Sequence, residues 1–482
     1  MQYATIIRIL GILLMIFSLT MLPPAIVSAI YEDGGGSAFI STFFLSLITG
    51  FILFWPKRKA RAELKIRDGF LIVVLFWTVL STFGAVPFIL AQSLPVSFAD
   101  AVFESFSGLT TTGATVISGL DELPHSILYY RQQLQWLGGM GIIVLAVAIL
   151  PLLGIGGMQL YRAEMPGPMK DNKLTPRIAG TAKALWYIYL GITIACALAY
   201  WMAGMTTFDA IAHSFSTVAI GGFSTHDSSI GYFDSNSIEL ICAFFMFIAG
   251  INFALHFISV RTLTIKPYLK DPEFRGYCTI LAVVILCCVS VLLYYQEYKF
   301  TDALVKSIFH SVSIATTAGF ASADFAGWPT LLPVLLIFSS FIGASAGSTG
   351  GGMKVIRILL LFKQGMREIK RLIHPHGIFL IKLGKASVSD RVVQAVWGFF
   401  ATYVVLFVLL MLILLADGLD QITAFSAVAA CMNNLGPGLG DVAVNYSGLS
   451  DLAKYVLSFA MLLGRLEIFT LLVLFTPYFW RR

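Results

Sequence analysis

Charged residues are scarce in this chain. Only 12% of its 482 residues are Asp, Glu, Lys or Arg, whereas 58% are hydrophobic. Ordinary soluble domains carry about a quarter charged residues, so this composition excludes that class. We expect a protein that lies in the lipid bilayer and has no nucleic-acid partner.

Cysteine pairs and reactive clusters are also missing. The chain has six cysteines, none of them in a CxxC motif and most of them inside apolar runs: Cys196, Cys242, Cys278, Cys287, Cys288 and Cys431. Their scatter fits neither a disulfide framework nor a metal site, and we interpret them as packing residues. Nor do His, Cys, Asp and Ser gather at reactive spacing, so we predict no enzyme and no covalently bound cofactor.

Long apolar runs separated by short polar loops dominate the sequence, a pattern typical of a polytopic helical membrane protein. The first run exceeds the apolar core of a signal peptide, about 7–15 residues, so we predict a retained span there. The predicted spans are 4–30, 37–55, 68–91, 132–155, 184–204, 237–260, 277–295, 330–362 (interrupted), 392–416 and 452–477.

Basic residues cluster in alternate loops. They include Lys57, Arg58, Lys59, Arg61, Lys65 and Arg67; Arg162, Lys170, Lys173, Arg177 and Lys183; Arg261, Lys266, Lys270 and Arg275; and Lys363, Arg367, Lys370, Arg371, Lys382, Lys385 and Arg391. The positive-inside rule places all these loops in the cytoplasm. A multi-pass topology with both termini cytoplasmic follows.

One short pattern is written four times. The copies read AVFESFSGLTTTGAT (101–115), AIAHSFSTVAIGGFS (210–224), SIFHSVSIATTAGFA (307–321) and AFSAVAACMNNLGPG (424–438). Each carries a glycine twelve positions after its first residue: Gly113, Gly222, Gly319 and Gly436. Each copy also falls in a loop opposite to the basic ones, so the four units share one orientation.

The predicted fold is therefore an all-α polytopic membrane protein. Four parallel span–P-loop–span repeats would surround one pore with pseudo-fourfold symmetry, and two extra spans would precede them. The predicted divisions are 1–67 (extra spans and a basic loop), 68–160, 161–270, 271–375 (with a glycine-rich loop) and 376–482.

These loops suit a cation. A short helix that dips into the membrane and returns points its C-terminal end, with roughly half a negative charge, at the pore. Carbonyl oxygens in the following segment can replace the water shell of an ion, and glycine lets the backbone turn them inward. The predicted filter comprises Thr111, Thr112, Gly113, Ile220, Gly221, Gly222, Thr317, Ala318, Gly319, Asn434, Leu435 and Gly436. Of these, all but the four repeat glycines are the predicted ion ligands.

Acidic residues recur five positions beyond three of the glycines, at Asp227, Asp324 and Asp441. Carboxylates around an outer mouth would raise the local cation concentration. The alternative is that they are ordinary polar residues of exposed loops.

The apolar run 330–362 is broken by a glycine-rich string from Ile342 to Lys354, with glycines at Gly343, Gly347, Gly350, Gly351 and Gly352. Each glycine costs a helix up to about 1 kcal/mol relative to alanine, so a continuous helix is excluded. The break lies on the cytoplasmic side of the predicted filter, where a flexible loop could plug the pore. A fixed kink is one alternative; a nucleotide-binding P-loop is another, although the string lacks GK[ST] and follows no strand.

Arg465 interrupts the last apolar run, where a charge costs about 2.5–3.5 kcal/mol on insertion scales. We interpret it as an electrostatic barrier near or below the filter, with a structural ion pair to Glu467 as the alternative.

His213 and His310 occupy equivalent positions in two short helices, where the first repeat has Glu104. We expect hydrogen-bonding braces there and no metal ligands.

The four single-glycine loops, the two extra N-terminal spans, the break in 330–362, and the motifs SIATTAGF and NNLGPGLG together resemble the Trk/Ktr/HKT superfamily of potassium transporters over essentially the whole chain. The resemblance implies potassium uptake through a channel-like pore in the bacterial cytoplasmic membrane, gated by the glycine-rich loop. It also implies a homodimer controlled by a cytosolic ring of TrkA-like, nucleotide-binding regulatory subunits, and a filter-adjacent role for Arg465. In relatives a serine at the position of Gly113 accompanies sodium permeation, so Gly113 favours potassium and rubidium. No loop carries TVGYG, and we expect weaker discrimination against sodium than in tetrameric potassium channels.

The segment 363–391 is basic and amphipathic. The simplest explanation is contact with anionic lipid head groups. The more specific hypothesis is that this segment, beside the predicted gate, docks the regulatory subunit.

For the whole protein, the alternative function is a potassium symporter coupled to protons or sodium. Parallel repeats and the near absence of intramembrane acids argue against that class.

Overall fold

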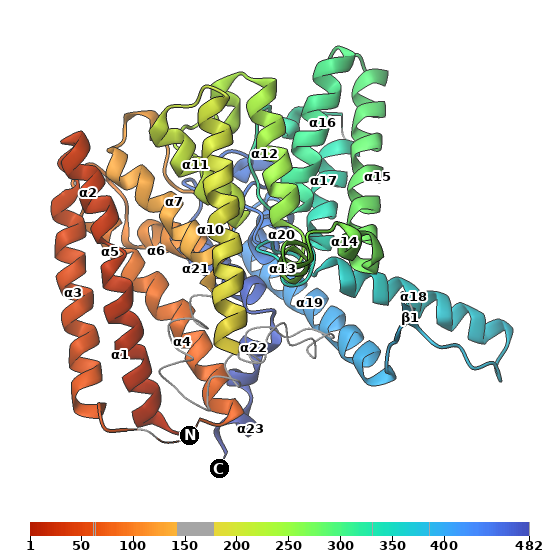
Figure 1. Ribbon diagram of the computed structural model, residues 1–482, viewed down its shortest axis with the longest axis horizontal. Coiled ribbons are helices and arrows are strands. Elements are labelled where there is room, and N and C mark those ends of the chain that lie inside the picture. The colour runs from red at the N-terminus through yellow and green to blue at the C-terminus, as the bar shows by residue number, and fades with distance from the viewer. Residues whose placement is uncertain (61, 63, 142–177, 330, 385, 482) are drawn as a thin grey trace.

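The computed structural model describes residues 1–60, 62, 64–141, 178–329, 331–384 and 386–481. The described part is helical apart from one short antiparallel hairpin, β1 (Lys382–Leu383) with β2 (Ala386–Ser387). Figure 1 shows long helices side by side around a centre of shorter ones, with the two termini near each other at one end. The predicted all-helical membrane architecture is confirmed at this level.

Before the first repeat motif come α1 (Tyr3–Leu19), α2 (Leu22–Tyr31), α3 (Gly36–Phe54) and η1 (Trp55–Lys57). Helices α1 and α3 cross closely, because a Cβ on Gly11 would lie 2.6 Å from the Gly50 carbonyl oxygen and one on Gly50 2.8 Å from that of Gly11. Such small residues let apolar helices approach backbone to backbone in lipid.

Four stretches then follow a similar order of long helix, short helix, loop and second helix. The first holds α4 (Ile66–Gly84), α5 (Val86–Leu90), α6 (Phe98–Leu109), η2 (Leu120–Glu122) and α7 (His125–Gly139). The second holds α10 (Ile178–Met202), α11 (Thr207–Ala219), η4 (Ser229–Phe233), α12 (Asn236–Ala249), α13 (Phe253–Thr262) and α14 (Lys266–Lys270).

The third holds α15 (Pro272–Tyr294), α16 (Phe300–Ala315), η5 (Phe325–Gly327), α17 (Leu331–Ile342) and α18 (Val355–Ile373). The fourth holds α19 (Asp390–Ala416), α20 (Gln421–Asn433), η6 (Gly440–Val442), α21 (Asp451–Arg465), α22 (Phe469–Leu472), η7 (Val473–Phe475) and α23 (Pro477–Trp480).

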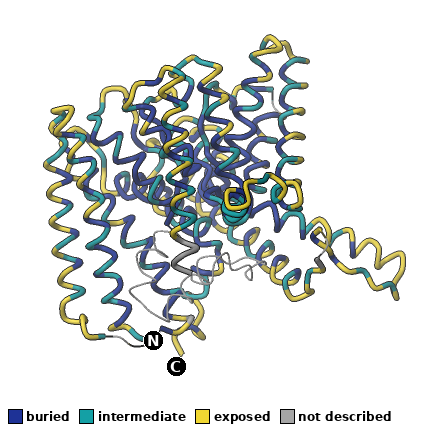
Figure 2. The backbone as a smooth tube through the Cα atoms, viewed as in Figure 1, coloured by how far each residue is buried: buried dark blue, intermediate teal, exposed yellow. Residues whose placement is uncertain are grey.

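The distribution of polarity is that of a membrane protein. Long helices expose apolar side chains on their outer faces, with Ile52 62%, Leu286 68% and Val405 58% exposed. Polar side chains are buried instead along the central short helices. The interior of the molecule is dark blue, the colour of buried residues, in Figure 2. Six described helices are long and apolar enough to cross a membrane, or up to eight if each of two bent pairs is one span.

Two predicted spans are wrong in their continuity. The run 237–260 is α12 and α13 at 92° to each other, and the run 452–477 is α21 and the helical turn Phe469–Phe475 at 108°. In the first break, the Asn252 side chain accepts a hydrogen bond from Ala254 N and so begins a new helix. In the second, Glu467 and Ile468 take positive φ angles of 52° and 60°. The interruption of 330–362 is confirmed, whereas the predicted span 132–155 extends past residue 141, outside the described residues.

Candidate ion-conducting site

The four loops after the short helices share one backbone conformation. In each, a residue with positive φ is followed two positions later by the repeat glycine, also with positive φ. The pairs are Thr111 (57°) with Gly113 (82°), Ile220 (55°) with Gly222 (80°), Thr317 (74°) with Gly319 (83°), and Asn434 (56°) with Gly436 (95°). Positive φ is uncommon for residues other than glycine, so this agreement marks four copies of one structure.

The four loops also contact one another in a closed cycle. A Cβ added to any of the four glycines would lie within 3.0 Å of a carbonyl oxygen of the neighbouring loop. The pairs are Gly113 with Gly221 O, Gly222 with Ala318 O, Gly319 with Leu435 O, and Gly436 with Thr112 O. Each loop therefore abuts the next, and the fourth returns to the first. Glycine is required here twice, for its φ angle and for this close approach.

Two side chains, one on α7 and one in the ring itself, hold the loops in place. Gln135 on α7 donates through Nε2 to Gly221 O (2.6 Å) and accepts from Phe223 N (3.0 Å). Asn434 Nδ2 donates to Thr112 Oγ1 (2.9 Å) and so joins the fourth loop to the first. The Gly221 carbonyl is thus bonded to protein on one lone pair, and a carbonyl oxygen has two.

Polar side chains of the short helices brace the segments that follow the ring, which we call the exit loops. His213 Nε2 lies 2.9 Å from Ser224 Oγ, and His310 Nε2 lies 3.3 Å from Ala323 O. Their Nδ1 atoms lie 3.0 and 2.9 Å from backbone carbonyls one helical turn earlier. Both nitrogens of each ring are occupied in this way, and the described residues contain no group of three or more possible metal ligands.

The first repeat uses an ion pair for the same purpose. Glu104 on α6 accepts from Val116 N (3.0 Å) and from Arg131 Nε (2.8 Å), with both side chains buried. Arg131 Nη1 also donates to Ser224 O (3.0 Å) in the second loop. Sequence reasoning noted Glu104 only as the counterpart of the histidines and missed Arg131. The available signal was an arginine directly before the predicted span 132–155.

The three acids beyond the ring differ in environment. Asp227 accepts from Gly119 N (3.1 Å) and Leu120 N (3.0 Å) and so joins the second exit loop to the first. Asp324 caps η5 by accepting from Ala326 N (3.1 Å), whereas Asp441 is exposed. Their equivalent sequence positions therefore do not give equivalent structural roles.

The glycine-rich segment 343–354 joins α17 to α18 and meets the C-terminal ends of three short helices. Thr349 Oγ1 donates to Val218 O (3.0 Å) on α11, and Gly352 N donates to Asn433 O (3.0 Å) on α20. Gly351 N donates to Thr317 Oγ1 (2.7 Å), just after α16. These ends are where the helix dipoles favour a cation, and in this structure the segment's donors occupy them.

Each of the five glycines of the segment lies where a residue with a Cβ would be strained or would clash. Gly343, Gly347 and Gly352 have φ angles of 70°, 72° and 71°. A Cβ on Gly350 would lie 2.7 Å from Thr316 O, and one on Gly351 would clash with Asn433 O. The sequence indicated flexibility. The structure shows in addition that three of these glycines are required by their φ angles and that Gly350 and Gly351 are required by close packing at the short-helix ends.

Arg465 ends α21 and joins three parts of the site. Its Nη1 donates to Thr111 Oγ1 (3.3 Å) in the first loop and to Thr349 O (3.2 Å) in the glycine-rich segment, and its Nη2 donates to Gly138 O. The predicted position midway along a continuous span is wrong, because the helix breaks directly after it. Glu467, the alternative partner, forms an ion pair with Arg357 on α18.

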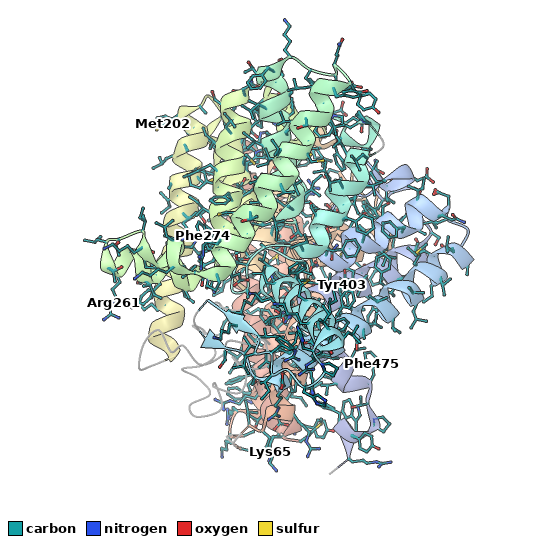
Figure 3. The ribbon with its side chains drawn as sticks, turned by 90° about the vertical axis from the view of Figure 1, so that its right-hand side faces the viewer. Lys65, Met202, Arg261, Phe274, Tyr403 and Phe475 are labelled. Atoms are coloured by element: carbon teal, nitrogen blue, oxygen red, sulfur yellow. The ribbon has the colours of Figure 1, made fainter. Side chains whose placement is uncertain are left out.

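The basic residues used for the topology lie away from this site where they are described. Figure 3 shows Lys65 at the lower end of the molecule and Arg261 on its flank. The basic positions 61, 162, 170, 173, 177 and 385 lie outside the described residues. Lys354 and Arg357, which sequence reasoning did not single out, are buried beside the glycine-rich segment.

Comparison with known proteins adds a family. A family model described as the cation transport protein TrkH matches residues 35–481. The Trk system potassium uptake protein TrkH of Vibrio parahaemolyticus is 62% identical over 484 residues, covering 100% of both chains. The protein of that name from Escherichia coli K12 is 58% identical over 482 residues, again covering 100% of both.

The Escherichia coli K12 protein TrkG is 44% identical over 471 residues, covering 98% of this chain and 97% of its own. A crystal structure of the potassium transporter TrkH from Vibrio parahaemolyticus superposes with a TM-score of 0.92 at 59% identity, covering 100% of both chains.

Proposed function

The chain belongs to the TrkH family of cation transport proteins, and on that premise we propose that it takes up potassium through a channel-like pore. Its relatives are named for potassium uptake by the Trk system, and its own architecture is that of a multi-pass membrane protein. The observation that carries the proposal is the closed cycle of four glycine loops with one backbone conformation.

In this proposal the four loops form a selectivity filter with pseudo-fourfold symmetry. Four short helices direct their C-terminal ends toward one centre, which favours a cation and disfavours an anion. Carbonyl oxygens of Thr111, Thr112, Ile220, Gly221, Thr317, Ala318, Asn434 and Leu435 are the proposed potassium ligands. Gly221 O can face an ion while it keeps its bond from Gln135.

The glycine-rich segment is the proposed gate. It hydrogen-bonds beneath the ring to three short-helix ends, and Arg465 holds its Thr349 carbonyl. These contacts support a closed state in which backbone donors and a guanidinium occupy the path of the ion. Opening requires the segment to withdraw, after which water or potassium can take its place at the helix ends.

Regulation from the cytoplasm completes the proposal. Both termini and the basic loops are assigned to the inner face of the bacterial cytoplasmic membrane by the positive-inside rule. Helix α18, with exposed Lys363, Lys370 and Arg371, projects away from the body close to the gate (Figure 1). It suits the docking of a nucleotide-binding, TrkA-like ring; homodimer formation rests on the family resemblance.

The test is radioactive rubidium uptake into liposomes that hold the purified chain, with potassium trapped inside. Uptake driven by the potassium gradient and inhibited better by external potassium than by sodium is the expected result. A chain that is silent alone and active with its cytosolic partner also supports the gated pore. Uptake that demands an imposed proton or sodium gradient would contradict it in favour of the symporter.

A further inference from the structure

One carboxylate outside the ring contacts the chain on both sides of the tip residues 349–352. We call the two contacted positions the arms: Ala346 in the glycine-rich segment and Ile356 at the start of α18. Glu273 lies in the first turn of α15 and is buried, with 7% of its surface exposed. Its Oε1 accepts a hydrogen bond from Ala346 N at 2.7 Å and another from Ile356 N at 3.2 Å. The two amides lie on opposite sides of the tip residues 349–352.

The backbone N–H groups of Ala346 and Ile356 have few other hydrogen-bond acceptors within reach. Ile356 is in the first turn of α18, where backbone N–H groups lack an intrahelical acceptor. Ala346 lies in the segment itself, between residues that use their own groups elsewhere: Ser345 N donates to Gly250 O (3.0 Å), and Gly347 O accepts from Phe253 N (3.0 Å). A buried amide without an acceptor is costly, so the two hydrogen bonds to Glu273 stabilise this position of the glycine-rich segment.

The geometry also explains how a glycine-rich segment can be held still. Five glycines in the segment raise the conformational entropy that must be lost when it is ordered. A buried amide that loses its hydrogen-bond acceptor costs about 1–3 kcal/mol, so each of the two bonds to Glu273 opposes release of the segment. A single oxygen that fixes both arms therefore keeps the tip in reach of the short-helix ends.

We propose that Glu273 is the positioning residue that holds the glycine-rich segment beneath the ring of loops, by tying its two arms to α15. The inference rests on the proposed function in one respect, because it treats the segment as the gate. It goes beyond that function by naming the residue on which the closed position depends. Loss of this residue frees the segment and leaves the ring itself intact.

The experiment compares Glu273→Gln and Glu273→Ala with the wild-type full chain. The matched control is Asp271→Asn, two residues away, whose side chain caps α15 through Phe274 N (2.7 Å) and for which asparagine is an equally good cap. Two quantities are measured without any partner protein. They are rubidium uptake into liposomes and amide hydrogen exchange at Ala346 and Ile356.

We expect basal uptake to rise about tenfold in Glu273→Ala, equivalent to about 1.4 kcal/mol, and by less in the nearly isosteric Glu273→Gln. Exchange at the two amides rises in the same order. The potassium-over-sodium preference stays at the wild-type value, because no loop of the ring bonds to Glu273 through the described hydrogen bonds. Asp271→Asn raises neither uptake nor exchange, because it keeps the helix cap and removes only a like charge near Glu273.

The outcomes separate this inference from the proposed function. If the wild type conducts and both Glu273 variants match it in uptake and exchange, Glu273 does not hold the segment. If exchange rises at both amides but no variant conducts under any gradient, and adding the cytosolic partner does not start uptake, Glu273 holds the segment and the pore proposal is wrong. Should Glu273→Ala fail to fold, the isosteric glutamine variant carries the same comparison. Uptake that rises equally in Asp271→Asn would assign the effect to α15 in general and overturn the inference.

Discussion

Arg131 and Glu104 form a buried ion pair directly behind the ring of glycine loops, with Arg131 Nε 2.8 Å from Glu104 Oε1. The pair does more than neutralise two charges. Glu104 also accepts a hydrogen bond from Val116 N in the first exit loop, and Arg131 donates one to Ser224 O in the second exit loop. The guanidinium also lies over the Phe223 ring, 4.3 Å from its centroid. Two loops of the ring therefore share one electrostatic support.

Removal of one partner from this pair is expected to be strongly destabilising. Arg131→Gln leaves the Glu104 carboxylate buried without its counter-charge, at a cost of about 3–5 kcal/mol. We expect a lower melting temperature in detergent and loss of rubidium uptake. Glu104→Gln with Arg131→Gln removes both charges and should recover part of the stability. If the double variant is no more stable than Arg131→Gln, the two residues do not act as a pair.

The close contact at Gly113 predicts an effect on both stability and selectivity. Gly113→Ala places a Cβ against the Gly221 carbonyl oxygen at a φ of 82°, and a left-handed residue with a Cβ costs about 1–2 kcal/mol before the clash is counted. We expect reduced rubidium uptake and weaker inhibition by potassium relative to sodium. The control is Gly191→Ala on α10, where a Cβ meets nothing within 4 Å. Equal effects at both positions would contradict a special role for the ring.

The sequence predicted those features that the chain encodes locally. The repeat glycines predicted four equivalent loops, and the five glycines of 343–354 predicted a break in a helix. The breaks after Gly250 and Arg465 escaped prediction, because the single glycine beside each of them costs a helix only about 1 kcal/mol. Packing requires glycine at the first break, because a Cβ on Gly250 would lie 2.4 Å from the Tyr277 hydroxyl on another helix. Partnerships across long separations, such as that of Glu273 with Ile356, leave no pattern in a single sequence.

Arg465 offers a test that separates charge from hydrogen bonding. Its guanidinium joins Thr111, Thr349 and Gly138, whereas the compact ammonium of a lysine cannot reach three such partners together. Arg465→Ala removes both the charge and the bonds, so we expect higher rubidium flux and altered rectification. Arg465→Lys keeps the charge. If the flux and rectification of Arg465→Lys match the wild type, the charge acts as a barrier. If they match Arg465→Ala, the hydrogen bonds of the guanidinium limit the flux. Unchanged flux and rectification in Arg465→Ala would contradict both readings.

His226 joins the first two exit loops on the side of the ring away from the glycine-rich segment. Its Nδ1 lies 2.5 Å from Asp121 Oδ1 and its Nε2 lies 3.4 Å from Asp209 Oδ1, while its ring stacks on Tyr232 with centroids 3.4 Å apart. The His213 ring lies 6.3 Å away on α11. Burial lowers the pKa of His226, but hydrogen bonds and charges from Asp209 and Asp121 outweigh it, so its pKa is raised above the usual 6.5.

The raised pKa of His226 fixes the sign of a pH effect. The folded state binds the proton more tightly than the unfolded state, so the stabilisation is complete below pH 6.5 and is lost as the pH rises through the raised pKa. We expect the melting temperature of His226→Gln to fall furthest below wild type at about pH 6 and to approach it under alkaline conditions. His376→Gln, at an exposed position, serves as the control and should show no such trend. A wild-type advantage that is constant with pH, or that grows as the pH rises, would show that the two carboxylates do not hold a protonated His226.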